Sequence, residues 1–293
     1  MTQPILSTLA TAEPSGATTI SRTEFRLLRD LIFAETGIHL SPIKRALLVG
    51  RLSRRLRALG LASFGAYYER LAAGDPDELV QMIDAICTNE THFFREPRHF
   101  VYLAQQHLPA LVRAAAQGRP RGLRVLSAGC STGEEPFSLA MLLDTHCPPA
   151  QGWRHEIIAT DLSTRVLAEA REGIWPLQRS NEIPADYLKR YMLRGIDDQQ
   201  GKMKARAELR QTVQFCRLNL NAPRWPVAGQ FDLIFCRNVL IYFTAEGRLR
   251  VVDRLLDRLA PNGLLFVGHA ESLAGITTRV RCVEPTIYAR RSE

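Results

Sequence analysis

The sequence lacks every feature that would place the chain in a membrane or export it. No apolar run reaches the roughly 20 residues that a membrane-spanning helix needs. The first residues, Met1 to Thr19, are rich in Ala, Ser, Thr and Pro, but no basic region precedes an apolar core, as it would in a signal peptide. We therefore expect a disordered tail at residues 1–19 and a cytoplasmic chain without direct insertion into a membrane.

The sequence also lacks any Cys-x-x-Cys pair, although it contains six cysteines, at positions 87, 130, 147, 216, 236 and 282. Most of these cysteines stand in apolar surroundings. In a chain of 293 residues, reduced and buried thiols are therefore favoured over disulfides or metal ligands. Histidines give no metal site either, because His92 and His99 are seven positions apart with no third ligand nearby. We predict that the protein holds no metal.

The composition is that of an ordinary soluble protein, with 46% hydrophobic and 23% charged residues, and the length suffices for two modest domains. The net charge of +8 admits nucleic acid, an acidic protein or an anionic membrane as partner. One predicted helix is rich in arginine, and its Arg51, Arg54 and Arg55 share a face. Such a face is commonly only solvated, but no acidic residue interrupts this one, so we expect a docking surface. Few aromatic residues accompany it, which disfavours nucleic acid.

Helix signals fill the first hundred residues. Ser21 and Glu24 form a capping box, and Ser41-Pro42 is an N-cap followed by proline at the first helical position. We predict a helical N-terminal domain at residues 20–95, followed by a linker helix at residues 96–122.

Short apolar runs alternate with helical segments after residue 122. The runs cover residues 123–126, 156–159, 213–216, 231–236 and 264–268, and helices are expected near residues 134–146, 163–172 and 245–259. This alternation predicts an α/β domain at residues 123–293, with a mostly parallel sheet covered by helices. Residues 173–212 break the pattern and predict an inserted subdomain of short antiparallel strands.

The first strand runs into a glycine turn, Gly129 to Gly133, and a helix follows. Glycines at such a turn let the backbone approach a ligand. No lysine follows Gly133, so the turn is not a P-loop, and Glu134 and Glu135 would repel a pyrophosphate. These acids suit a ligand with cationic groups. S-adenosylmethionine fits, because it carries an ammonium and a sulfonium but no phosphate.

Polar residues also follow the next strands, where ligands of parallel sheets bind. Asp161 could accept hydrogen bonds from ribose hydroxyls, or it could cap the following helix. Asn219 and Leu220 could contact adenine, or they could form a polar turn. The sequence leaves both pairs of alternatives open.

The fourth strand is followed by Arg237-Asn238 and, shortly after, by Tyr242. Enzymes that methylate the exocyclic amines of bases typically have two prolines after the Asn or Asp at this position. No proline follows Asn238, which argues against that chemistry.

The segment Thr88 to Pro97 is polar around an aromatic pair, and it is either part of the site or an interdomain hinge with a phenylalanine in the core.

Four blocks, in order and at compatible spacing, carry a resemblance to one known family. They are residues 88–96, 127–138, 159–161 and 236–243. Over about residues 20–293 the chain resembles the CheR-type chemotaxis receptor glutamate methyltransferases. The resemblance implies an all-α N-terminal domain and a Rossmann-like S-adenosylmethionine-dependent methyltransferase domain with a small antiparallel β-subdomain. It also implies methyl transfer to glutamate carboxylates of receptors, giving γ-methyl esters.

The resemblance further implies roles for residues of this chain. Arg95 and Tyr242 would lie nearest the transferred methyl group as catalytic residues. The residues implied to hold the cofactor are Asn89, Thr91, Arg95, Gly129, Glu134 or Glu135, Asp161, Asn219, Leu220, Arg237 and Asn238. The basic helix with Arg51, Arg54 and Arg55 would face the cytoplasmic helical bundle of transmembrane chemoreceptors. Four points stay open: which receptor is modified, whether a receptor C-terminal peptide binds at the β-subdomain, which of Glu134 and Glu135 contacts the cofactor, and the oligomeric state.

Two other functions also stay open at this point. A methyltransferase for RNA or a small molecule is favoured by the sequence pI near 9.5 and opposed by the missing prolines after Asn238. A non-catalytic cofactor-binding scaffold is opposed by the presence of Arg95, Asp161 and Tyr242.

Overall fold

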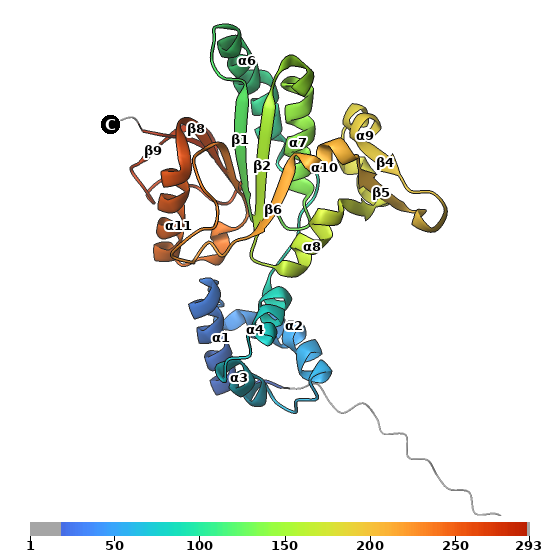
Figure 1. The fold of residues 1–293 in the computed structure, drawn as a ribbon. Helices are drawn as coiled ribbons and strands as arrows, with labels where there is room; N and C mark the ends of the chain where they lie inside the picture. The colour runs from blue at the N-terminus through green and yellow to red at the C-terminus, as the bar shows by residue number, and fades with distance from the viewer. Residues whose placement is uncertain (1–18, 292–293) are drawn as a thin grey trace, which may run out of the picture.

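The structure, a computed structural model, describes residues 19–291 (Figure 1). It contains a helical domain, a connecting helical segment and a sheet domain with an inserted β-subdomain, which confirms the predicted class of fold. The predicted tail at residues 1–19 lies, apart from its last residue, outside the described residues. Within residues 19–291, no helix combines the length and apolar character that crossing a membrane requires.

The helical domain consists of α1 (Arg22–Thr36), α2 (Arg45–Ala58), α3 (Phe64–Ala72) and α4 (Pro76–Ile86). Ser21 and Glu24 form the predicted capping box of α1. The buried faces of the four helices share one core, whose members include Leu28, Leu52 and Tyr67. The helical domain therefore has a hydrophobic core of its own, and its outer surface is left to contact the sheet domain.

Two details of this domain differ from the sequence-based expectation. A 3₁₀ turn at Pro42–Lys44 follows the Ser41 signal, and α2 begins only after it. The short helix α3 was not predicted, although Ser63 caps it by accepting a hydrogen bond from the N–H of Ala66. The linker is helical as expected, with α5 (Pro97–Tyr102), a π-helical turn at Leu103–His107 and α6 (Leu108–Ala116).

The main sheet has the strand order β6-β2-β1-β7-β8-β10-β9. The five predicted strands are present and parallel to one another, namely β1 (Gly122–Ala128), β2 (Arg154–Asp161), β6 (Val213–Arg217), β7 (Phe231–Cys236) and β8 (Leu259–Val267). Two strands were not predicted, β9 (Val280–Glu284) and β10 (Ile287–Arg290), and they add an antiparallel edge. The sheet is therefore mixed rather than wholly parallel.

The predicted helices cover both faces of this sheet, as α7 (Glu134–His146), α8 (Thr164–Glu172) and α11 (Ala245–Arg258). Successive strand residues point to opposite faces. In β7, Phe235 belongs to the core shared with α7, and Ile234 belongs to the core shared with α11. The sheet is thus buried on both sides, and ligands can reach it only at its edges and ends.

The predicted insert is a three-stranded antiparallel sheet with the order β3-β5-β4. Its elements are β3 (Ile174–Pro176), η4 (Leu177–Glu182), α9 (Ala185–Tyr191), β4 (Met192–Arg194), η5 (Asp197–Gln199) and β5 (Lys202–Ala205), and α10 (Ala207–Gln211) leads back to the main sheet. Figure 1 shows this β-subdomain in yellow, beside α8 and α10.

The strand order reverses between β2 and β7, because β1 pairs with both. Ligands of open α/β sheets bind at the carboxyl ends of the strands at such a reversal. Figure 1 shows the helical domain at this end of the sheet.

Candidate cofactor and active site

A cavity of about 320 Å³ lies where the helical domain meets the carboxyl ends of β1, β2 and β7. Its volume is within the roughly 300–1,000 Å³ that ligand pockets occupy. The cavity brings together most of the residues predicted for the site, namely Asn89, Thr91, Arg95, Gly129, Glu135, Asp161, Asn219, Leu220, Arg237, Asn238 and Tyr242. The predicted residues Glu134, Arg54 and Arg55 do not line it.

The glycine turn joins β1 to α7 and forms one wall of the cavity. The N–H groups of Gly129 and Cys130 both donate to the carbonyl of Thr160 on β2, at 2.7 and 2.9 Å. Gly129 has φ 87°, and a Cβ there would lie 2.4 Å from Cγ2 of Val239. Only glycine therefore fits this position.

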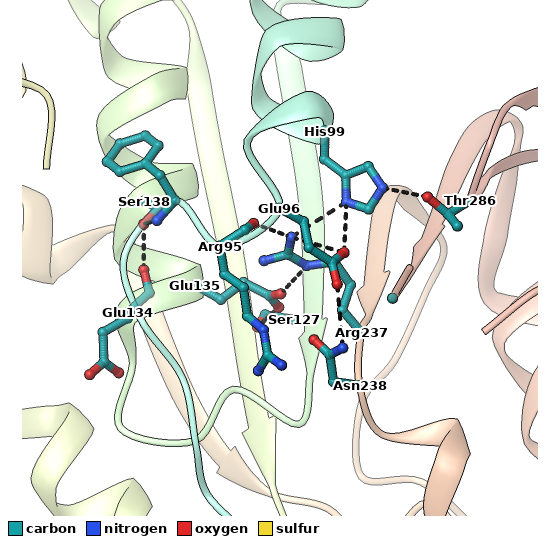
Figure 2. Close-up of polar contacts among 12 residues, drawn as sticks. Arg95, Glu96, His99, Ser127, Glu134, Glu135, Ser138, Arg237, Asn238 and Thr286 are labelled. Carbon is teal, nitrogen blue, oxygen red and sulfur yellow. Dashed lines mark hydrogen bonds and ion pairs between the residues drawn. The ribbon is translucent and has the colours of Figure 1, made fainter. Parts of the chain in front are cut away.

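The two acids after the turn point in different directions, as Figure 2 shows. Glu135 lines the cavity, accepts a hydrogen bond from the Ser127 hydroxyl at 2.6 Å and pairs with Arg237 at 2.7 Å. Oε1 of Glu134 instead lies 3.0 Å from Nη1 of Arg179, a residue of the β-subdomain. Burial raises the pKa of Glu134. Of the two acids between which the sequence left the choice open, Glu135 lines the cavity and Glu134 does not, and contact of Glu135 with the cofactor stays a prediction.

Asp161 ends β2 with a buried carboxylate that is oriented by the backbone. One oxygen accepts from the N–H of Ser131 at 2.8 Å and the other from the N–H of Ser163 at 2.9 Å. Burial raises the pKa of Asp161, and these two hydrogen bonds oppose the rise. The helix α8 is capped by the Ser163 side chain, so the interpretation of Asp161 as its N-cap was wrong.

The turn after β6 is the polar turn that the sequence offered as one alternative, and contact with adenine stays a prediction. Asn219 donates through Nδ2 to the carbonyl of Glu35 at 2.6 Å, and its Oδ1 accepts from the N–H of Asn221 at 2.9 Å. Asn219 is thus a polar turn residue that fixes the turn to α1. Leu220 lines the cavity beside it and presents an apolar side chain.

Two amides in the cavity wall have unused hydrogen-bonding atoms. Nδ2 of Asn89 and Oδ1 of Asn238 are buried and have no hydrogen-bond partner within residues 19–291. Buried polar atoms are rarely left unpaired. A ligand that both accepts and donates hydrogen bonds would satisfy them. S-adenosylmethionine has a carboxylate and an ammonium as well as hydroxyls, so the residues present fit this cofactor.

Arg237 is the centre of a buried ionic network behind the cavity (Figure 2). Its side chain is 2% exposed, and its guanidinium contacts Glu135 at 2.7 Å, Glu96 at 3.6 Å and His99 at 3.4 Å. The other ring nitrogen of His99 lies 2.8 Å from the Thr286 hydroxyl. Sequence reasoning did not assign Glu96, His99 or Thr286 to this network. Only the position of Glu96 directly after Arg95 could have indicated the first of them.

Glu96, His99 and His269 bring three ligand atoms within 4.8 Å of one another, a grouping that the sequence did not reveal. His269 and Glu96 supply the neighbouring groups that were not found for His99 in the sequence, and His92 is not part of the grouping. The Arg237 guanidinium is 3.6 Å from Glu96 and already places positive charge there. The absence of a metal therefore stays a prediction.

We predict that His99 makes the fold sensitive to acid. Burial is the main reason why the pKa of His99 falls from 6.5 to about 4, and Arg237 lowers it further. Between these values the unfolded chain binds more protons than the folded one, so the free energy of unfolding should decrease as pH falls, by at most about 3 kcal/mol. Urea unfolding between about pH 7 and pH 4 should show a smaller decrease in His99→Gln than in the wild type. Equal pH dependences would assign the effect to other groups.

The two predicted catalytic residues both line the cavity. Nη1 of Arg95 donates to the carbonyl of Glu90 at 2.8 Å, and Figure 2 shows its guanidinium pointing away from Arg237. The backbone of Tyr242 is held by the helical domain, because its carbonyl accepts from the N–H of His39 at 2.8 Å. Both domains therefore contribute to the walls of the cavity around these two side chains.

The segment before Arg95 connects the two domains and has a phenylalanine in the core, as the alternative interpretation of the sequence expected. Phe93 is buried in the core of the sheet domain, and its ring centre lies 5.0 Å from that of Trp175. The two interpretations are compatible, because polar residues of the segment such as Asn89 and Thr91 line the cavity while Phe93 anchors the segment in the core.

The basic helix does not present one free face, which corrects the sequence-based expectation. Arg55 pairs with Glu78 of α4 at 2.5 Å, and Glu78 is almost completely buried. Arg51 lines the cavity and donates to the hydroxyl of Thr88 at 2.8 Å. Of the three predicted docking residues, Arg54 is the exposed one.

The arrangement of the site defines a class of protein. A mostly parallel sheet with a glycine turn that is not a P-loop after β1 and an acid after β2 is typical of Rossmann-like S-adenosylmethionine-dependent methyltransferases. Residues 89–289 match the CheR methyltransferase SAM binding domain, and residues 23–87 match the CheR methyltransferase all-alpha domain. The chain belongs to the CheR methyltransferase family.

Curated relatives agree along nearly the whole chain. The chain is 41% identical over 273 residues to chemotaxis protein methyltransferase 2 of Pseudomonas aeruginosa, covering 92% of this chain and 93% of the relative. It is 39% identical over 271 residues to the chemotaxis protein methyltransferase of Escherichia coli, covering 92% and 91%. The protein is therefore an S-adenosylmethionine-dependent methyltransferase.

Proposed function

We propose that the protein transfers the methyl group of S-adenosylmethionine to glutamate side chains of chemoreceptors in the cytoplasm, forming γ-methyl esters. One observation carries the proposal: the cavity between the domains gathers two buried carboxylates, Glu135 and Asp161, and two amides, Asn89 and Asn238, each with one buried atom that has no hydrogen-bond partner within residues 19–291. The names of the relatives support a chemotaxis substrate.

Each of these residues has a definite task in the proposal. Asp161 accepts hydrogen bonds from the ribose hydroxyls, and Glu135 binds the ammonium. Asn89 and Asn238 satisfy the remaining polar groups of the cofactor, and Leu220 packs against the adenine. The bound cofactor supplies a methyl group on a positively charged sulfur, which is a good leaving group.

The proposed reaction needs no general base. A glutamate has a pKa near 4.3 and is already ionised at neutral pH. Catalysis can therefore depend on alignment of the carboxylate oxygen, the methyl carbon and the sulfur, and such positioning can supply on the order of several kcal/mol. Arg95 and Tyr242 orient the carboxylate. A tight bidentate pair with Arg95 would stabilise the ground state, so the contact should strengthen only in the transition state.

The direct test is transfer of label from methyl-tritiated S-adenosylmethionine to receptor-containing membranes. The proposal expects protein-bound label that is released as methanol by mild base, because carboxyl methyl esters are labile there. Label in RNA, or in base-stable positions, would contradict the proposal and favour another methyltransferase substrate.

Docking on the receptor should depend on Arg54. The exposed guanidinium would attract an acidic helical bundle, and this attraction weakens as salt rises. Arg54→Glu should lower kcat/KM for receptor by about threefold to tenfold at low salt and flatten the salt dependence. The Kd for cofactor should not change. An unaltered salt dependence would contradict this role.

A receptor C-terminal peptide is a further proposed partner. The order β3-β5-β4 leaves β3 and β4 as edges, to which an extended peptide could add a strand. Titration with such peptides would detect it, and no binding would exclude this site.

A further inference from the structure

The β-subdomain reaches across to the backbone of the segment that carries Thr91 and Arg95. Nη1 of Arg179, on η4, donates to the carbonyl of Thr91 at 2.8 Å. The Glu182 carboxylate, on the same turn, accepts a hydrogen bond from the N–H of Phe93 at 3.0 Å. Nη1 of Arg179 and Oε2 of Glu182 lie 3.6 Å apart. Together they hold two backbone groups of the cavity wall, on either side of His92.

Aromatic contacts extend the same interface. The ring of Phe93 lies 5.0 Å from that of Trp175, and the ring of Phe94 stacks on Tyr187 at 5.4 Å. Trp175 also donates through Nε1 to the carbonyl of Thr132 at 3.1 Å. The insert therefore contacts both the segment before Arg95 and the glycine turn, which are two walls of one cavity.

The segment needs external support, because its backbone is strained. Phe94 has φ 51° and Glu96 has φ 58°, and Arg95 stands between them. Residues other than glycine keep such conformations only where their surroundings impose them. The contacts from the β-subdomain supply part of that constraint, on the N-terminal side of Arg95.

The anchor for this support lies on the rigid part of the fold. Arg179 pairs at 3.0 Å with Glu134, whose side chain is 1% exposed at the start of α7. A buried carboxylate requires a charged or hydrogen-bonded partner, so removal of either member leaves the other unpaired. Arg179 thus joins three elements, namely η4, α7 and the segment with Thr91. This explains why Glu134 is acidic although it does not line the cavity.

We propose that Arg179 and Glu182 are positioning residues for methyl transfer, which hold Thr91 and Arg95 in place. The β-subdomain is then a structural part of the active site as well as a place for docking. This inference rests on the proposed function, because it concerns the same cavity and the same reaction.

The test compares Arg179→Ala, Glu182→Ala and Glu182→Gln with the wild type in calorimetric titrations with S-adenosylhomocysteine and in receptor methylation. Arg179→Ala and Glu182→Ala should each raise the Kd or lower kcat by about tenfold, the effect expected for loss of a charged hydrogen bond. Glu182→Gln should recover most of the loss, because its amide oxygen can still accept from the N–H of Phe93. If Glu182 served stability alone, Glu182→Ala would lower Tm, but its Kd and kcat would not differ from those of Glu182→Gln.

The control is Arg190→Ala, which removes another arginine of the insert. Arg190 pairs with Asp144 at 2.9 Å, is 54% exposed and does not contact the Thr91 segment. It should leave Kd and kcat unchanged.

Wild-type Kd and kcat in both alanine variants would overturn the inference, and so would an equal loss in Arg190→Ala or in Glu182→Gln. If Arg179→Ala fails to fold, the two Glu182 variants decide. Failure of the wild type itself to bind S-adenosylhomocysteine would instead contradict the proposed function, before any variant is compared.

Discussion

Arg95→Ala should lower kcat for receptor methylation by about 100-fold, because it removes a group that orients the incoming carboxylate. The guanidinium lines the cavity, and no carboxylate within residues 19–291 pairs with it. It is therefore available for a substrate glutamate. The Kd for S-adenosylmethionine should rise by less than about tenfold, because this role concerns the transition state. Tyr242→Phe should act in the same direction.

The measurement is a comparison of kcat with the calorimetric Kd. Arg98→Ala is a matched control, because Arg98 is an exposed arginine only three positions further on and does not line the cavity. Wild-type turnover in both Arg95→Ala and Tyr242→Phe would show that neither residue orients the substrate.

Arg237→Ala should destabilise the fold by about 3–5 kcal/mol, since removal of one partner leaves buried carboxylates uncompensated. The side chain is 2% exposed and pairs with Glu135 at 2.7 Å and Glu96 at 3.6 Å. Binding of the cofactor should be lost as well, because Glu135 would no longer be fixed. Urea unfolding and calorimetry on the same preparation would measure the two effects.

A double variant separates the two consequences. Arg237→Met combined with Glu135→Gln removes both charges and keeps similar volumes, so it should recover part of the stability. It should not recover cofactor binding, because the carboxylate proposed to bind the ammonium is gone. A single Arg237→Ala variant as stable as the wild type would contradict the account of this network.

Local signals in the sequence predicted the elements that depend on near neighbours. The capping box of α1, the five parallel strands and the glycine turn were found because each is encoded within a few residues. The strand β9 was missed because exposed charged residues such as Arg281 and Glu284 interrupt its apolar residues, and β10 was missed because its apolar run, Ile287–Ala289, is only three residues long.

The rest of the site depends on contacts between distant segments. Glu134 and Glu135 could not be distinguished, because neighbours on a helix differ by about 100° and only the packing of α7 fixes which one faces the cavity. His99 meets Thr286 from 187 positions away. The pairing of Arg55 with Glu78 joins two helices, so the spacing along α2 alone could not show that Arg55 is unavailable for docking.

The central claim is that the cavity between the two domains binds S-adenosylmethionine, and calorimetric titration tests it most directly. The account predicts saturable one-to-one binding of S-adenosylmethionine and S-adenosylhomocysteine by the wild type, and loss of both in a folded Asp161→Ala variant. Binding of neither compound by the folded wild type, or undiminished binding by Asp161→Ala, would contradict it.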